Sequence, residues 1–140
     1  VSHNHPEGIK GAQATALAVF LARKDADKAT IRRQIETRFA YNLRCSVDDI
    51  RAGYRFDVSC QGSVPQSIIA FLDSKDYATA VKNAISLGGD ADTMACIAGA
   101  IAQAYYKTMP ADIVRQARRN LPEALLAVLN QFCERFDCPY

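Results

Sequence analysis

The chain has 140 residues, enough for one compact domain that buries about two thirds of the surface its unfolded form exposes. Its hydrophobic fraction of 49%, charged fraction of 23% and net charge of +2 are typical of globular proteins and argue against a nucleic-acid-binding surface. No apolar run approaches the roughly 20 residues of a membrane-spanning helix, and no signal peptide is visible, so we expect a cytoplasmic protein without membrane contact.

Apolar residues recur at intervals of three and four almost throughout, which predicts an all-α fold. We expect a compact multi-helix orthogonal bundle in a single domain over residues 1–140. The predicted helices, in chain order, span about residues 6–23, 27–39, 47–52, 63–73, 77–87, 90–106, 111–117 and 122–136. The segment 41–62 is the least periodic. The helix from residue 90 has small residues on several faces and is predicted to be the central one.

The five cysteines are odd in number and show no Cys-x-x-Cys spacing, which argues against a disulfide framework and against a zinc cluster. We interpret them as reduced thiols. Cys96 falls within an apolar helical pattern, so it is expected to be a small buried residue.

The sharpest local feature is the run Gly88-Gly89-Asp90-Ala91-Asp92-Thr93 at the start of the predicted central helix. One interpretation is structural: Asp90 accepts hydrogen bonds from the first-turn amides, and Asp92 complements the helix dipole. The other interpretation is a cation site. Spacing alone does not decide between them.

Three observations favour the cation. Two carboxylates beside a helix that is expected to be buried would repel one another and lose hydration unless a cation compensates. Aspartate and threonine oxygens are hard ligands, which favour Mg²⁺, with Mn²⁺ as an alternative, and no His or Cys stands beside them. The two glycines would let the backbone approach a phosphate-bearing ligand closely.

The block from Ala84 to Ala100, ISLGGDADTMACIAGA after the first alanine, resembles the carboxy-terminal signature of the ADP-ribosylglycohydrolases, the family of dinitrogenase-reductase-activating glycohydrolase. Two further segments resemble the same family in the same order. They are Ser2-His3-Asn4-His5-Pro6-Glu7-Gly8-Ile9-Lys10-Gly11-Ala12 and Cys60-Gln61-Gly62-Ser63-Val64-Pro65. The resemblance therefore extends over nearly the whole chain.

The resemblance implies an all-α enzyme with a two-magnesium centre that hydrolyses the glycosidic bond between ADP-ribose and an acceptor in a protein or small conjugate. It makes Asp90 and Asp92 catalytic, and Asp90, Asp92 and Thr93 metal ligands. It also places His3, Glu7, Gly88 and Gly89 at the substrate. For His3 and Glu7 the alternative is an exposed terminus with a helix-opening glutamate. Tyr105 and Tyr106 could stack on an adenine, although a core or surface position is the simpler interpretation.

The family pattern also contains an amino-terminal half with further acidic ligands, which this sequence does not show. Three side chains alone do not complete the octahedral shell of magnesium. We therefore expect the carboxy-terminal part of a longer ADP-ribosylglycohydrolase, completed in cis or in trans and inactive in isolation, whose uncovered apolar faces make it self-associate. The alternative function is a non-catalytic module that binds ADP-ribose or a partner protein.

Overall fold

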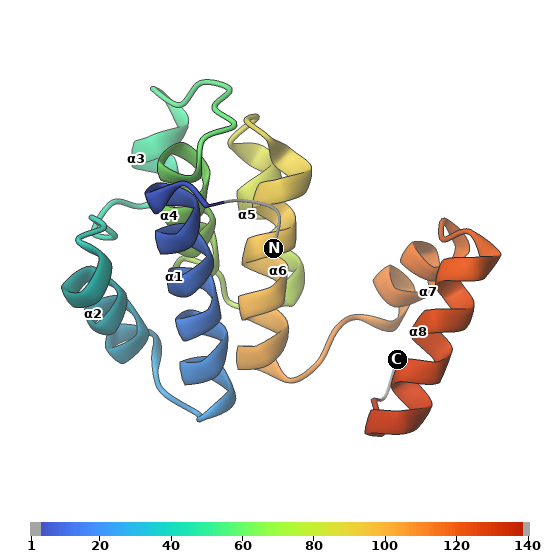
Figure 1. The fold of residues 1–140 in the computed structure, drawn as a ribbon. Helices are drawn as coiled ribbons and strands as arrows, with labels where there is room; N and C mark the ends of the chain where they lie inside the picture. The colour runs from blue at the N-terminus through green and yellow to red at the C-terminus, as the bar shows by residue number, and fades with distance from the viewer. Residues whose placement is uncertain (1–3, 139–140) are drawn as a thin grey trace. The chain divides into compact units, whose positions relative to one another are not determined.

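The computed structural model describes residues 4–138, and this part of the chain contains eight helices and no strand, so the predicted all-α class is confirmed (Figure 1). Two compact units form along the chain, one up to Thr108 and one from Met109 onward. The first unit contains α1 (Pro6–Arg23), α2 (Lys28–Phe39), α3 (Val47–Arg51), α4 (Cys60–Leu72), α5 (Tyr77–Ser86) and α6 (Ala91–Tyr106). The second contains α7 (Ala111–Arg119) and α8 (Glu123–Phe136). None of the described helices is long and apolar enough to cross a membrane.

Most helix ends lie where local sequence signals place them. Pro6 opens α1, and the Asp27 side chain accepts from the Thr30 amide to cap α2. At α3, Ser46 and Asp49 form a reciprocal capping box, as the sequence predicts. Gly88, just past α5, has a φ of +73°, a conformation that glycine adopts without strain.

The start of α4 differs from the prediction by three residues. The helix begins at Cys60 rather than Ser63, because the Ser59 side chain accepts from the Gly62 amide and caps the helix earlier. Pro65 consequently lies inside α4. Proline has no amide hydrogen to donate to the carbonyl of Gln61 four residues earlier, so this helical bond is absent.

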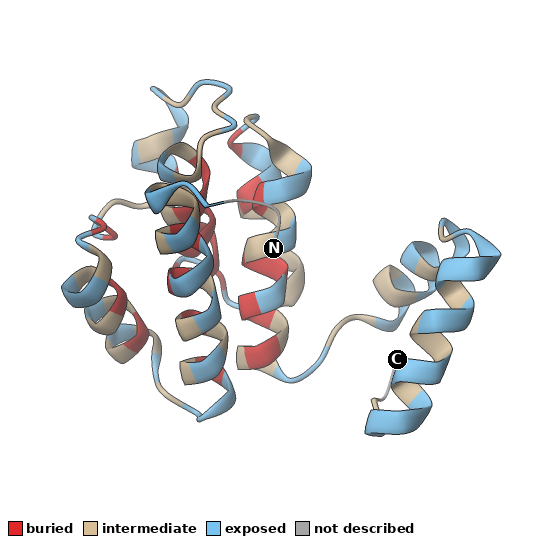
Figure 2. Cartoon of the chain, in the orientation of Figure 1, coloured by how far each residue is buried: buried red, intermediate tan, exposed pale blue. Residues whose placement is uncertain are grey.

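In the first unit, α4 is the most enclosed helix, and α6 packs against α1, α4 and α5. Figure 2 shows that the buried residues of this unit face its interior. From Ser67 to Leu72 every residue of α4 is buried, including Ser67, whose hydroxyl donates to the Ser63 carbonyl at 2.7 Å. α4 therefore has the most buried residues, while α6, the helix that the sequence indicated as central, packs against three other helices of the unit.

The helix α6 retains an exposed face. Cys96 is exposed, so the prediction that it is buried was wrong. The small residues of α6 instead permit close packing on its other faces. A Cβ at the buried Gly99, for example, would lie 3.4 Å from the Tyr77 hydroxyl and 3.5 Å from a Val81 methyl of α5. Small side chains thus indicate a short distance between helices, and they do not show that a helix is surrounded on every side.

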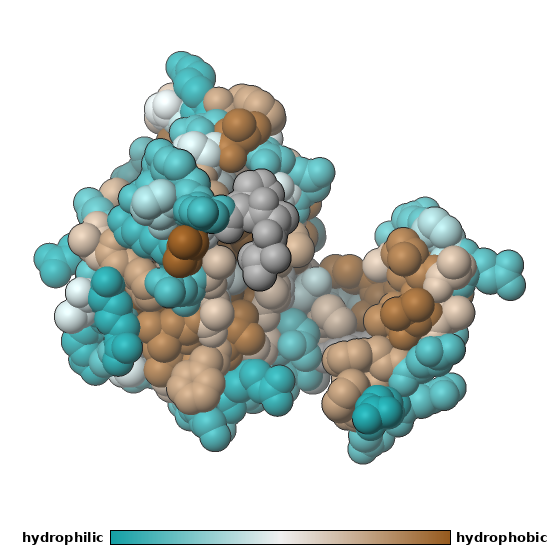
Figure 3. Space-filling view, viewed as in Figure 1, coloured by the Kyte–Doolittle hydropathy of each residue, from teal (hydrophilic) through white to brown (hydrophobic). Residues whose placement is uncertain are grey.

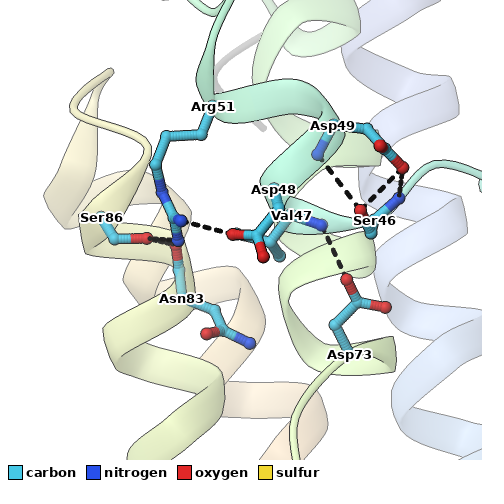
Figure 4. A network of polar contacts seen from close by, with 8 residues as sticks. All are labelled: Ser46, Val47, Asp48, Asp49, Arg51, Asp73, Asn83 and Ser86. Carbon is cyan, nitrogen blue, oxygen red and sulfur yellow. Dashed lines mark hydrogen bonds and ion pairs between the residues drawn. The ribbon is translucent and has the colours of Figure 1, made fainter.

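The short helix α3 is attached to its neighbours by polar contacts (Figure 4). The Val47 amide donates to Asp73 Oδ2, just past the end of α4, at 2.7 Å. Arg51 forms an ion pair with Asp48, and its Nη2 donates to the Ser86 hydroxyl of α5 at 2.9 Å. These contacts hold α3, and the loop that follows it, against the ends of α4 and α5.

The second unit is a pair of helices in which no described residue is buried (Figure 2). On α8 four large apolar side chains are each more than half exposed, namely Leu125, Val128, Phe132 and Phe136. Their spacing of three and four residues places them along one side of the helix. Figure 3 shows apolar side chains gathered on the visible face of this unit.

Candidate functional site

The run from Gly88 to Thr93 forms the turn between α5 and the first turn of α6, and we call it the acidic turn. Asp90 occupies the N-cap position of α6, but its side chain makes no capping hydrogen bond. The first-turn aspartate, Asp92, instead accepts from the adjacent Thr93 amide at 2.8 Å. The capping bond that the structural interpretation assigned to Asp90 is therefore absent.

The two carboxyl groups of the acidic turn approach one another. A hydrogen bond shared with the Asp90 carboxyl, followed by the one from the Thr93 amide, lowers the pKa of Asp92. The convergence of two carboxyl groups favours a cation because, with both ionised, they repel one another and gain from a positive charge between them.

The two carboxyl groups are less buried than the sequence suggested. Asp92 and Thr93 are exposed, and Asp90 is half-buried. The expectation of carboxylates deprived of water was therefore wrong. Loss of hydration is thus a minor part of any argument for a cation here, and the proximity of the carboxylates is the major part.

The donor atoms of the acidic turn fit part of a magnesium shell. Asp90, Asp92 and Thr93 offer hard oxygen ligands on adjacent positions of one helix start. Within residues 4–138, no three or more His, Cys, Asp or Glu side chains are grouped so as to hold a metal ion. A complete octahedral shell would thus need further oxygens, from water, from a phosphate or from other carboxylates.

A cleft of about 750 Å³ lies between the first turns of α1 and α4. Its lining residues are His5, Glu7, Gly8, Ile9, Ala12, Gln13, Val58, Ser59, Cys60 and Gln61. The two helices approach closely there, since a Cβ at Gly11 would lie 3.0 Å from a methyl group of Val64. The cleft is therefore lined mainly by the two segments that resemble the family outside the acidic turn, together with Gln13 and with Val58 and Ser59 of the preceding loop.

Glu7 is half-buried in the first turn of α1 and forms an ion pair with Lys10 at 3.7 Å. The ammonium group of Lys10 lies 4.6 Å from the centre of the Tyr41 ring. Burial, and then the neighbouring Glu7 and Cys60, raise the pKa of Tyr41, whose buried hydroxyl has no hydrogen-bond partner among the described residues. Glu7 thus contacts the cleft and opens the helix at the same time, whereas His3 lies outside the described residues.

The acidic turn and the cleft lie at the same end of the first unit. In Figure 1, α1, α4 and α6 all begin at the upper end of this unit. One side chain bridges the two helix starts: the Tyr54 hydroxyl donates to the Gly62 carbonyl of α4 at 2.7 Å and lies 3.4 Å from the Met94 sulfur of α6. The starts of α4 and α6 are therefore in contact through one side chain.

Tyr105 and Tyr106 lie at the other end of α6. Their rings make edge contacts with Phe71, with centres 5.3 and 6.5 Å apart, and the Tyr106 hydroxyl donates to the Ser74 carbonyl at 2.8 Å. Their role is to pack against the end of α4, which agrees with the simpler of the two interpretations.

The acidic turn and the two segments that line the cleft also lie within a match to a known protein family. The model of the ADP-ribosylglycohydrolase family matches residues 1–138. The chain belongs to the ADP-ribosylglycohydrolase family. This match covers the acidic turn, both walls of the cleft and the second unit, so all three family-like segments lie in one family match. No curated protein and no solved structure matches the chain.

Sequence reasoning missed the contribution of the loop 52–59 of this ADP-ribosylglycohydrolase-family chain. Val58 and Ser59 line the cleft, and Tyr54 contacts the acidic turn. The segment has no helical period, and its contacts join it to other elements, from Gly62 in the next helix to Met94, 40 positions away. A weak local signal was present in Asp57 and Ser59, since Asp57 Oδ1 accepts from the Ser59 amide at 2.7 Å in an aspartate turn.

Proposed function

We propose that this chain supplies part of the metal site and part of the substrate cleft of a magnesium-dependent hydrolase that cleaves ADP-ribose from an acceptor. The observation that carries the proposal is the convergence of the Asp90 and Asp92 carboxyl groups at a helix start where neither side chain of the pair caps the helix in the usual way. Family membership supplies the reaction class, and the cleft beside the first turns of α1 and α4 supplies room for a ligand.

In this proposal Asp90, Asp92 and Thr93 hold the cation, with Mg²⁺ favoured over Mn²⁺ as the natural occupant. The chemistry that a bound magnesium ion supplies is the orientation and polarisation of ribose oxygens and the activation of a water molecule. The residues of the chain bind and orient the substrate. The starts of α1, α4 and α6 present their amide ends toward one end of the unit (Figure 1), which favours an anionic group such as a pyrophosphate.

Glu7 and Gln13, on the α1 side of the cleft, and Gln61 on the α4 side offer polar atoms that can position a ligand, while Ile9 and Val58 supply apolar surface. This mixture suits a nucleotide-like ligand, which has a flat apolar base and polar sugar and phosphate groups. We infer that further acidic ligands complete the metal shell in the active enzyme, from another segment of the same protein or from a second chain.

The test is thermal unfolding of the natural protein with and without magnesium, for wild type and for Asp92→Asn. If the acidic turn holds the cation, added magnesium raises the melting temperature of wild type, because a ligand that binds only the folded state stabilises it by about 2.7 kcal/mol at one hundred times its Kd. Asp92→Asn abolishes most of this increase and the release of ADP-ribose from a conjugate.

Asp112→Asn is a matched control. Asp112 also follows an alanine at the second position of a helix, in the first turn of α7, so the same substitution removes the same charge from an equivalent local position. It should leave the response to magnesium unchanged. A wild-type melting temperature indifferent to magnesium would overturn the metal assignment. Binding of ADP-ribose without hydrolysis would favour the non-catalytic module instead.

A further inference from the structure

The loop between α3 and α4, residues 52–59, packs over the acidic turn by way of Tyr54. A Cβ added at Gly89 would lie 2.9 Å from the Tyr54 hydroxyl oxygen and 3.1 Å from Cζ, with Cε1 closer still. Real Cβ atoms essentially never show separations below 3.0 Å, so the Tyr54 ring occupies the space that a side chain at position 89 would need. The requirement for glycine at this position comes from a neighbouring side chain of the protein itself.

The adjacent glycine has a different role. Gly88 has a φ of +73°, and nothing lies within 4 Å of the position of its Cβ. Gly88 is therefore suited to the backbone conformation that ends α5, whereas Gly89 is suited to the approach of Tyr54. The sequence predicted that glycine ends the helix here and that both glycines let a ligand approach the backbone; the structure places the Tyr54 ring beside Gly89.

The same loop contacts the first turn of α4 at two points. The Tyr54 hydroxyl donates to the Gly62 carbonyl at 2.7 Å. The Asp57 carboxylate also packs against Gly62, so closely that a Cβ at Gly62 would collide with it. Gly62 directly follows Cys60 and Gln61, which line the cleft. The loop is thus fitted against the cleft wall and the acidic turn together.

The phenol of Tyr54 is suited to this position in its neutral form. Burial, and then the Asp57 and Asp90 carboxylates, raise the pKa of Tyr54 above its usual value. A phenol, whose ordinary pKa is about 10, keeps its proton at neutral pH, so the hydroxyl is a hydrogen-bond donor. Its proton is directed to the Gly62 carbonyl, which fixes the orientation of the ring that covers Gly89.

From this geometry we propose that Tyr54 is a positioning residue, which holds the acidic turn in a fixed place relative to the α4 wall of the cleft. The ring sets the position of Gly89, one residue before Asp90, and the hydroxyl ties the ring to Gly62. The inference rests on the proposed function, because a fixed distance between the two features matters when one holds a cation and the other holds the substrate. Loss of the hydroxyl should loosen the carboxylate pair and leave the core of the unit intact.

A double-mutant cycle tests the contact without reference to activity. Gly89→Ala, Tyr54→Leu and the double variant are compared by urea unfolding. Gly89→Ala should lower the midpoint strongly when Tyr54 is present and far less when leucine replaces the ring, because the branched, shorter side chain leaves space. Equal losses from Gly89→Ala in the two backgrounds would show that the ring does not set the position of Gly89, and would overturn the proposal.

The role toward the cation is measured with Tyr54→Phe, which keeps the ring and removes the hydroxyl. The magnesium concentration needed for half of the thermal stabilisation should rise about tenfold, as observed when groups that orient metal ligands are removed. Tyr106→Phe is the control: it removes another phenol that donates to a carbonyl, at the opposite end of α6, and should leave this concentration unchanged.

The possible failures are distinguishable. If wild type does not respond to magnesium, the proposed function fails. If wild type responds and Tyr54→Phe gives the same magnesium dependence, the proposed function stands and the role of Tyr54 is overturned. If Tyr106→Phe shifts the dependence as much as Tyr54→Phe, the effect is a general loss of stability, which also overturns the positioning role.

Discussion

The ammonium group of Lys28 is predicted to be a major stabilising contact at the end of α4. It donates to the Leu72 carbonyl at 3.0 Å and to the Ser74 carbonyl. It also lies 5.2, 5.8 and 5.5 Å from the ring centres of Phe71, Tyr105 and Tyr106. The last carbonyls of a helix have no partners within it, so a charged donor from α2 satisfies groups that would otherwise remain unpaired.

The expected loss follows from replacing Lys28 with methionine, which keeps most of the apolar stem. A hydrogen bond to a charged group contributes about 1.5–3 kcal/mol, and a cation above an aromatic ring about 0.5–1 kcal/mol at an exposed site. These terms are not additive. The Ser74 carbonyl keeps the Tyr106 hydroxyl as donor, so mainly the Leu72 carbonyl is left without a partner. We expect a total loss of about 2–3 kcal/mol, after allowing for this retained donor.

Urea unfolding followed by far-ultraviolet circular dichroism measures this loss, and the melting temperature should fall by an amount on the order of 10 °C. Lys82→Met is the control, because Lys82 is exposed on α5 and its replacement should change stability by less than about 0.5 kcal/mol. If the two variants lose similar, small amounts of stability, the ammonium group does not stabilise the end of α4 and the reasoning is wrong.

Two further predictions concern the helix caps and the second unit. Asp76 is the N-cap of α5, and the hydrogen bonds from Thr79 lower its pKa. The ionised cap therefore stabilises the folded protein above the ordinary pKa of 3.8, and this stabilisation is lost as the pH falls through the lower pKa of the folded state. Asparagine also caps a helix but does not titrate, so the urea midpoints of wild type and Asp76→Asn should converge as the pH is lowered. A difference between the two midpoints that stays constant with pH would contradict this prediction. The exposed apolar side of α8 predicts self-association, and Phe132→Ser should weaken it in sedimentation at high concentration; wild type that sediments as a 15.3 kDa monomer would refute the prediction.

Local sequence signals correctly predicted the helical class, most helix ends and the position of the acidic turn. These depend on signals within a few residues, such as the period of apolar residues, the Ser46 and Asp49 capping box, and Gly88 after α5. A cap or a positive φ is satisfied by neighbouring atoms of the same chain segment. The tertiary structure therefore leaves such features where the sequence places them.

The burial of each surface, in contrast, depends on how the helices pack against one another. The exposure of Cys96 and Asp92, the enclosure of α4, and the placement of Tyr54 on Gly89 all depend on groups distant in sequence. The small residues of α6 show that other helices approach it closely. Which helices these are depends on the packing of α1, α4 and α5 around α6. The loop 52–59 has no helical period, and its contacts with α4 and α6 form only on folding, because they join residues from separate elements.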